Sequence, residues 1–401
     1  MKSILSARTA IKGFDRRCDR RGTVIVLAAC MMVVVIGIAA FTVDFALVNI
    51  TKGQVQNAAD SAAHAAMQDL VSSLGPGATI TSTHAASEAE STATKMTARF
   101  RSGDLESTQL SAKRDVRFGC RSWNTTTNEW ERQWGVAPYN MVEVTVRRTA
   151  SADAPLGAVF AKILGHDSFD VEARAVASIA PATGFALPED STASVDILPI
   201  AFDITTWNSL LAQVYDQTNS GFSDQHRYNT TSGTVSNYAD GVPEVNIYPD
   251  ANSAMPSGNR GTVDIGSSNN STADLRRQIQ YGINASDLDW FPDGEIRFND
   301  DGNLFLNGDT GISAAIESAL QSIVGHVRAI PIFIEVSGPG NNAQFTITRF
   351  VGVRIMAVKL TGGPGQRYLR VQPAPYSTRY ALRGNVPVTV DGVMSQPLLI
   401  D

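Results

Sequence analysis

One uncharged apolar run near the N-terminus constrains this 401-residue chain more than any other feature. The run covers residues 23–43 (TVIVLAACMMVVVIGIAAFTV). In helical form, about 20 such residues cross the ~30 Å hydrocarbon layer of a bilayer. A helix also satisfies its backbone hydrogen bonds internally, as lipid requires. The run therefore predicts a transmembrane helix, whose anchoring residues are Thr23, Val24, Ile25, Val26, Leu27, Val33, Val34, Val35, Ile36, Phe41 and Val43.

The charge on either side of this run predicts its orientation. Residues 1–22 carry a net charge of +5, whereas the whole chain carries −6, which leaves −11 on the remainder. Because an excess of Lys and Arg marks the cytoplasmic flank of a span, we expect residues 1–22 in the cytoplasm and residues 44–401 outside it. An acidic outer region argues against nucleic acid as a partner, since phosphate binding needs clustered basic residues. The basic residues nearest the span are Arg16, Arg17, Arg20 and Arg21.

Three kinds of processing compete with a retained anchor. The first is cleavage of a signal peptide, but a signal peptide has an apolar core of roughly 7–15 residues. The run over residues 23–43 is too long for one. Residues 27–30 (LAAC) look like a lipobox, but Cys30 is followed by the apolar MMVVVIGIAAF instead of a polar linker. Prepilin-like cleavage after Gly22 would leave the apolar helix at the new N-terminus, although Leu27 stands where type IV prepilins usually carry Glu. Whether the chain is cleaved after Gly22 stays open.

The helical pattern continues past the span without a proline until Pro76. Residues 24–70 are therefore expected to form one helix of about 70 Å. Its outer half carries an Ala-rich stripe, which permits close approach of another element. That element is either the chain's own folded domain, which we prefer, or a helix of another molecule. The stripe consists of Val48, Val55, Ala59, Ala62, Ala66 and Leu70.

Residues 44–180 place helix signals before strand signals. Residues 84–101 predict a second helix, and residues 156–165 a short apolar one. Residues 141–149 and 169–179 alternate with period two, as strands do. Helices followed by a small antiparallel sheet are typical of an α+β domain.

Five parts are predicted along the chain. They are a cytoplasmic tail (1–22), the transmembrane helix (23–43), a helix plus α+β domain (44–180), a linker (181–194) and a second α+β region of unknown role (195–401). The predicted fold class is therefore α+β, with a transmembrane helix that continues into a long helix.

The segment 21–63 carries a recognisable pattern: Arg21-Gly22, the apolar run, Val43-Asp44 and then QVQNAADSAA at residues 54–63. It resembles the N-terminal region of TadE/TadG-like proteins of the bacterial Tad (tight adherence, Flp) pilus-assembly systems. Residues 154–179 are also similar to a later part of TadG-like proteins, so the resemblance covers roughly residues 20–180. The residues that match the motif are Gly22, Asp44, Gln54, Gln56, Asn57, Ala58, Ala59, Asp60, Ala62 and Ala63.

This resemblance implies a single-pass protein of the bacterial inner membrane that faces the periplasm and takes part in assembling or anchoring a pilus. The implied partners are the lipid bilayer and other pilus-assembly proteins, with homo- or hetero-oligomers formed through the N-terminal helix. Some TadG-like proteins carry a von Willebrand factor A domain, whose cation binds Asp-x-Ser-x-Ser. Here the nearest match is DITTW at residues 203–207, where Trp207 occupies the second Ser position and cannot bind a cation.

No catalytic constellation stands out in the sequence, and no cofactor is expected. The five histidines form no ligand pair, and there is neither a Gly-x-Ser-x-Gly elbow nor a phosphate-binding loop. The best candidate for a cation is the acidic loop of residues 293–303, because Ca²⁺ prefers clustered oxygens. The same stretch reads as a plain hairpin with Asp301-Gly302 at its turn, which we prefer. The acidic residues concerned are Asp293, Glu295, Asp300 and Asp301.

The sequence therefore predicts a non-enzymatic, membrane-anchored structural component of a Tad/Flp-type pilus system, with an assembly, anchoring or minor-pilin-like role. The alternative is an anchored periplasmic or cell-surface module that binds cell-wall or glycan material through the Asn-, Ser- and Gly-rich residues 216–310. An anchored hydrolase ranks last, since nothing in the sequence singles out a pair of carboxylates.

Overall fold

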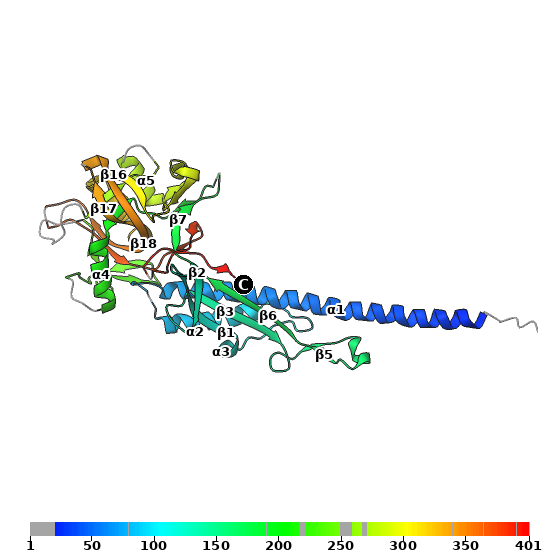
Figure 1. Ribbon diagram of the computed structural model, residues 1–401. Coiled ribbons are helices and arrows are strands. Elements are labelled where there is room, and N and C mark those ends of the chain that lie inside the picture. Colours follow the sequence, from blue (N-terminus) through cyan, green and yellow to red (C-terminus); the bar gives the residue numbers. More distant parts are fainter. Residues whose placement is uncertain are drawn as a thin grey trace, which may run out of the picture.

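One long helix dominates the protein and projects from its folded part as a rod (Figure 1). This helix, α1, runs without interruption over Arg21–Leu70, which confirms the prediction of one continuous helix. Its 50 residues give a length of about 75 Å. The computed structural model describes residues 21–78, 80–189, 191–216, 221–248, 259–266, 271–338, 340–363, 365–389 and 391–400.

The two halves of α1 have different surroundings. Between Val24 and Val43 its side chains are almost all exposed, among them Ile25 and Phe41. Among the described residues, α1 is the one helix long and apolar enough to cross a membrane. From Asp44 onward, one face of the helix is buried against the rest of the chain.

A five-stranded antiparallel sheet covers the outer half of α1. Its strands lie in the order β2-β1-β3-β6-β23, so that the C-terminal strand completes the edge next to β6. The helix α2 (Ser82–Thr97) packs beside α1 over this sheet. The strands are β1 (Val116–Asn124), β2 (Glu129–Trp134), β3 (Met141–Arg148), β6 (Val171–Ser178) and β23 (Leu398–Leu399).

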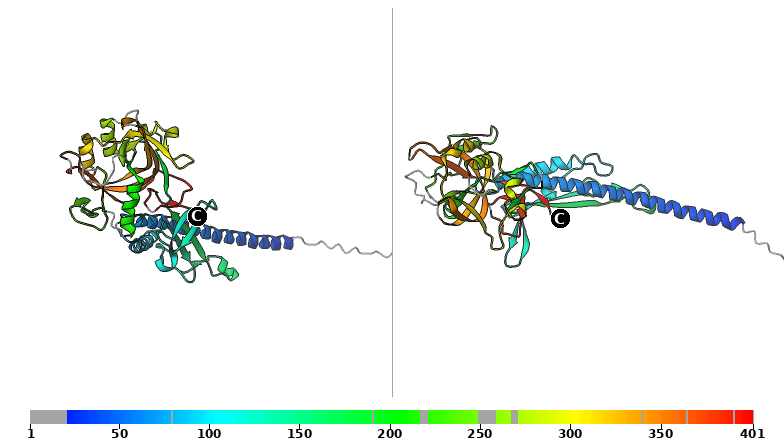
Figure 2. Two further views of the ribbon diagram at one scale, coloured as in Figure 1. Left: turned by 60° about the vertical axis from the view of Figure 1, so that its left-hand side comes forward. Right: turned by 90° about the horizontal axis from the view of Figure 1, so that it is seen from above.

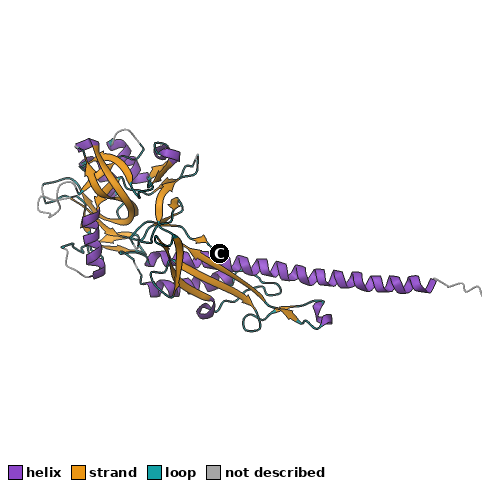
Figure 3. Cartoon of the chain, viewed as in Figure 1, coloured by secondary structure: helices purple, strands orange, loops and turns teal. Residues whose placement is uncertain are grey.

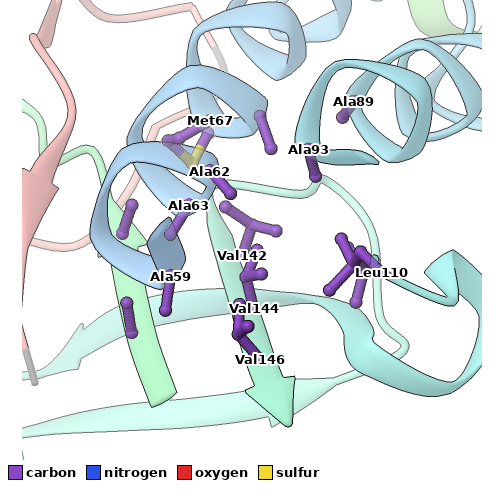
Figure 4. Packing of buried hydrophobic residues seen from close by; sticks show 14 of the residues in the cluster. Ala59, Ala62, Ala63, Met67, Ala89, Ala93, Leu110, Val142, Val144 and Val146 are labelled. Atoms are coloured by element: carbon purple, nitrogen blue, oxygen red, sulfur yellow. The ribbon is translucent and has the colours of Figure 1, made fainter. Parts of the chain in front are cut away.

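The core of this part is an alanine-rich helix face on a valine-rich strand (Figure 4). Val142, Val144 and Val146 of β3 enter this core together, because alternate residues of a strand share one face. The α1 residues against them are small, which lets the helix backbone approach the sheet closely. The buried apolar residues of α1 are Val55, Ala58, Ala59, Ala62, Ala63, Ala66, Met67 and Leu70. The partner of the Ala-rich stripe is therefore the chain's own domain, as preferred above.

The predicted short helix over residues 156–165 is wrong. This segment is a hairpin of β4 (Leu156–Gly157) and β5 (Ser168–Phe169), with a single 3₁₀ turn, η2 (Ala161–Leu164), at its tip. The turn ends at Gly165, whose φ of 87° is left-handed and stops the helix after one turn. Figure 2 shows this hairpin running along α1.

The C-terminal region is built on seven strands in the order β12-β19-β18-β16-β13-β9-β17, and its strands gather at the end of the molecule away from the rod (Figure 3). Because β18 also pairs with β17, five of them (β18, β16, β13, β9 and β17) close into a ring. The strands are β9 (Ile200–Asp203), β12 (Val245–Asn246), β13 (Arg260–Val263), β16 (Leu304–Asp309), β17 (Val327–Ser337), β18 (Ala343–Lys359) and β19 (Tyr368–Pro373).

Three helices pack on this sheet and bury Trp207, Leu275 and Leu320 in its core. They are α4 (Ile204–Asp216), α5 (Thr272–Tyr281) and α7 (Glu317–Gln321). The remaining short elements are η1 (Val71–Ser73), α3 (Ala112–Asp115), β8 (Ser194–Val195), β10 (Arg227–Asn229), β11 (Thr234–Ser236), β14 (Ile283–Asn284), α6 (Ala285–Leu288), η3 (Pro292–Gly294), η4 (Ala314–Ile316), η5 (Gly340–Asn342), β20 (Ser377–Thr378) and β22 (Met394–Ser395). The α+β fold class is confirmed.

The hairpin predicted around Asp301-Gly302 is wrong in its pairing. The turn is present, since the Asn299 N–H donates to the Asn303 carbonyl at 2.8 Å. The two flanking strands, however, join different sheets: β15 (Glu295–Arg297) pairs with β7 (Ala182–Ala186), whereas β16 pairs with β13 and β18. Ile296 of β15 and Leu306 of β16 nevertheless enter the same apolar core. Both strands therefore show the alternation of apolar and polar residues that the two strands of one hairpin would show.

Two strands connect the two parts of the protein. Within the predicted linker, β7 (Ala182–Ala186) pairs with β15 and with β21 (Ala381–Arg383). At the other end of the chain, β23 adds to the sheet that packs on α1. The five-part division of the chain stays a proposal. The pairing of residues 398–399 with β6 adds the C-terminal strand to the first α+β domain.

Candidate membrane-proximal site on the long helix

The QNAADSAA motif lies on the buried outer half of α1. Ala58, Ala59, Ala62 and Ala63 are 0% exposed, whereas Asn57 is exposed. Because protein cores are close-packed, a larger side chain at these buried positions would have to displace the neighbours that cover it. The alanines of the motif therefore serve the packing of α1 on its own domain.

The polar residues of the motif tie α1 to neighbouring segments. The Gln54 Oε1 accepts a hydrogen bond of 2.7 Å from the N–H of Gly103. Gly103 has a φ of 63°, and a Cβ there would lie 2.9 Å from Thr51 Oγ1, so glycine is required at this close approach. The Gln56 amide donates to Asp60 Oδ1 at 2.7 Å and to the Arg174 carbonyl at 3.2 Å.

Asp44, directly after the apolar run, holds the tip of the β4–β5 hairpin. Its side chain is 4% exposed and accepts hydrogen bonds from three successive backbone N–H groups. The Val159 N–H lies 2.8 Å from Oδ1, the Phe160 N–H lies 3.0 Å from Oδ2, and the Ala161 N–H also donates to Oδ2. The carboxylate thus satisfies N–H groups at the start of η2 that the turn leaves without partners.

A buried arginine holds the base of the same hairpin. Arg148, at the end of β3, is 1% exposed. Its guanidinium donates to the carbonyls of Ser102 and Ala154, the latter at 2.9 Å, and pairs with Asp104 at 2.8 Å. Arg148 and Asp44 therefore fix the two ends of one hairpin beside the point where the exposed half of α1 begins.

The surroundings of Asp44 favour its charged form. Burial alone would raise the pKa of this carboxyl group, but the N–H groups of Val159, Ala161 and Phe160, together with the charge of Lys162, hold the pKa below its usual value. Because the folded-state pKa is depressed, the carboxylate stabilises the hairpin above the ordinary pKa of an aspartate. That stabilisation is lost as pH falls through the lower, folded-state value.

Asp44→Asn is expected to loosen the hairpin tip without unfolding the domain. The amide keeps one neutral acceptor in place of two charged oxygens, so the bonds to residues 159–161 weaken. Hydrogen exchange read by mass spectrometry at pH 7 should show faster exchange in peptides covering residues 156–169 than in wild type. Asp60→Asn, which changes a carboxylate on the same helix, is the control and should leave these peptides unchanged. Equal exchange in Asp44→Asn and wild type would contradict the role of Asp44.

The other residues singled out in the sequence do not gather at this site. Glu295 pairs with Arg297 at 2.6 Å, and Asp293 lies in η3 with a φ of 57°. Within the described ranges, no group of three or more His, Cys, Asp or Glu side chains is placed to hold a metal ion. Arg16, Arg17 and Arg20 lie outside the described residues, and Arg21 begins α1.

Cys120, on β1, is the one cysteine that follows the apolar run in the sequence. The neighbouring Arg117 and Arg121 suggest a lowered thiol pKa when only the sequence is considered. In the structure, burial raises the pKa of the Cys120 thiol, so it is protonated at neutral pH. The side chain is therefore not an activated nucleophile.

A comparison with protein families matches residues 22–69 to the putative Flp pilus-assembly TadE/G-like family. The match covers almost the whole of α1, from the residue before the apolar run to the last buried turn. It confirms the resemblance of the N-terminal region and supports a role related to Tad/Flp pili. No curated protein and no solved structure matches the chain.

The contact between Asp44 and residues 159–161 was not predicted from the sequence, although both segments had been singled out there. The Val43-Asp44 pair and the stretch 154–179 were each part of the family resemblance. Their joint occurrence was the one available signal that the two segments touch. Nothing in either segment alone indicates the contact, because the partners of Asp44 are backbone N–H groups.

Proposed function

We propose that this protein is a single-pass, non-catalytic structural component of a Tad/Flp-type pilus-assembly system, held in the inner membrane by residues 23–43. The observation that carries the proposal is α1 itself. One unbroken helix joins an exposed apolar segment to a folded body, and the TadE/G-like match coincides with that helix.

The basic tail supports the proposed orientation. Residues 1–22 carry +5, which favours a cytoplasmic N-terminus and a periplasmic body. In this arrangement the rigid helix sets the distance between membrane and body. The 27 residues 44–70 of α1 lie beyond the proposed span, and one face of this segment packs on the body's own sheet and α2.

The division of α1 favours an anchoring role over a minor-pilin role. One face of its outer half is covered by the chain's own domain, so the continuous apolar surface of α1 left for other molecules is residues 24–43. Oligomers formed through the helix would therefore use residues 24–43. The non-catalytic part of the proposal is supported by the lack of a catalytic motif in the sequence and by the protonated thiol of Cys120.

A retained anchor has a defined chemical signature. Mass spectrometry of the native protein should find peptides from residues 1–22 in the membrane fraction and no form of the chain in sheared surface filaments. A strain that lacks the chain should lose surface filaments, and re-expression of the full chain should restore them. A new N-terminus at Thr23 in filaments would replace the anchoring role by a minor-pilin role. A lipidated Cys30 would overturn the topology, and normal filaments without the chain would contradict the pilus role.

The binding-module alternative concerns residues 216–310, part of which lies outside the described residues. No contact in the described part favours it. Failure of the purified chain to be retained by cell-wall material would remove it.

A further inference from the structure

The tip of the β4–β5 hairpin carries four large apolar side chains that face solvent. The exposed fractions are 53% for Val159, 40% for Phe160, 83% for Ile163 and 79% for Leu164. Single exposed apolar residues are ordinary on protein surfaces, but four within six residues form a patch that needs an explanation. We define residues 159–164 (VFAKIL) as the apolar tip.

The position of the apolar tip is set by Asp44. The carboxylate that binds the N–H groups of Val159, Phe160 and Ala161 belongs to the residue directly after Val43, the last residue of the apolar run. In Figures 1 and 2 the hairpin points along α1 toward the exposed half of that helix. The apolar tip therefore lies level with the end of the proposed span and continues its apolar surface.

We propose that the apolar tip inserts into the interfacial layer of the same bilayer that α1 crosses. This inference rests on the proposed function, because it requires residues 23–43 to span the membrane. Lipid is the occupant that the observations favour, since the tip is adjacent to a surface that is itself lipid-facing in the proposed topology. On α1 at the same level, Phe41 and Phe45 stack at 6.1 Å and are both exposed, which adds apolar surface at this depth.

The charges near the tip fit an interfacial position. Lys162 is exposed between the apolar residues and has the long stem that lets an ammonium group reach the headgroups while its methylenes stay in the apolar layer. The acidic Asp167 and Asp170 lie further down the hairpin, past Gly165, and are exposed. Both carboxylates can stay in water when residues 159–164 are inserted.

Tip insertion gives the body a second point of contact with the membrane. Four apolar side chains are too few to anchor a protein on their own, just as a single acyl chain gives only weak, reversible membrane binding. Tethered through α1, however, the tip is held at the surface and its insertion is intramolecular. A body carried by one helix can rotate about that helix, whereas two contacts fix which face it presents along the membrane. The tip is therefore an orienting contact and not an anchor.

Fluorescence quenching by lipid tests this proposal in the full-length chain. The native cysteines Cys18, Cys30 and Cys120 are replaced by Ser, and an environment-sensitive fluorophore is placed on Leu164→Cys. The protein is reconstituted in vesicles of phosphatidylethanolamine and phosphatidylglycerol, with and without lipids that carry a spin label near the headgroup. We expect the spin-labelled lipids to reduce the emission at residue 164 about twofold or more. Phe305→Cys, an exposed apolar site on the distant ring of strands, is the matched control and should not be quenched.

A third probe separates the failure of this inference from the failure of the proposed function. Ile36→Cys, in the middle of the span, should be quenched by lipids labelled deep in the acyl chain. Quenching at residue 36 without quenching at residue 164 would overturn the tip insertion and leave the anchor intact. Absence of quenching at both would overturn the anchor as well. Protection of residue 164 from aqueous quenchers without lipid quenching would show that a second copy or another protein covers the tip, which also overturns the proposal.

A variant that removes apolar side chains from the tip, read by a probe at a different position, gives independent evidence. Ile163→Ser with Leu164→Ser removes the two most exposed apolar side chains and leaves the backbone contacts of Asp44 in place. In these vesicles it should abolish quenching of a probe at Val159→Cys while the probe at residue 36 is still quenched. Unchanged quenching at residue 159 would contradict insertion through these side chains.

Discussion

Two arginines in the middle of the apolar run, Val33→Arg together with Val35→Arg, are expected to release the protein from the membrane. Residues 23–43 contain eleven Leu, Ile, Val and Phe residues. At about −0.3 to −0.6 kcal/mol each, these contribute roughly −3 to −7 kcal/mol to insertion, and one central Arg costs about 2.5–3.5 kcal/mol. A single Arg therefore leaves insertion near balance, whereas two make it unfavourable. Fractionation after an alkaline carbonate wash should find the double variant in the soluble or aggregated fraction and wild type in the membrane.

The control places the same two arginines on the outer half of α1. Asn57 and His64 are exposed there and belong to the helix but not to the span. Asn57→Arg with His64→Arg should leave the protein in the membrane fraction, with its fold intact. Retention of Val33→Arg/Val35→Arg in the membrane would show that residues 23–43 are not what holds the chain there.

The sequence predicted what depends on local patterns. The apolar run, the absence of proline and the recurrence of Val55, Ala59 and Ala62 were enough to predict one helix through residue 70. Helical periodicity depends only on residues three and four apart, so a local stretch of sequence shows it. The strand assignments of residues 141–149 and 169–179 held for the same reason: alternation toward a helix-covered face is a local pattern.

What the sequence did not predict depends on residues far apart in the chain. The strands on either side of Asp301-Gly302 alternate correctly, yet their partners lie at residues 184–186 for one and at residues 262–263 and 343–347 for the other. Alternation identifies a strand face but not a partner strand. The ten residues 156–165 look helical in composition, but Gly165 and the hydrogen bonds to Asp44, more than 110 residues earlier, limit the helix to one turn.

For the candidate site, too, the sequence indicated which residues matter but not what they contact. Asp44 and the QNAADSAA residues were singled out by their resemblance to a family, which says nothing of what each side chain touches. The structure gives the four alanines a packing role and Asp44 the role of a clamp for backbone N–H groups. The exposure of Ile163 and Leu164 could not be predicted from the sequence either, since neighbouring apolar residues are normally expected in a core.

Ala62→Asp is expected to destabilise the domain by about 3 kcal/mol or more. Ala62 is 0% exposed and packs between the sheet and α2 (Figure 4), so a carboxylate there has neither water nor a partner. This cost is a large fraction of the 5–15 kcal/mol that typically stabilises a domain. Urea unfolding of the full chain in detergent, followed by intrinsic tryptophan fluorescence, to which Trp123 on β1 and Trp130 on β2 contribute, should show a lower midpoint. Burial raises the pKa of such a carboxyl group in the folded state, so the loss should grow as pH rises above about 4.

His64→Asp is the matched control, since it introduces the same side chain two residues later on an exposed face of the same helix. Its effect should stay within about 0.5 kcal/mol, because the charge remains in water. The pair also distinguishes the two partners considered for the Ala-rich stripe. If the stripe joined α1 to a second molecule, Ala62→Asp would separate an oligomer and leave the unfolding midpoint of the body unchanged. A lower midpoint at every protein concentration, with no change in oligomer size, is what packing on the chain's own sheet requires.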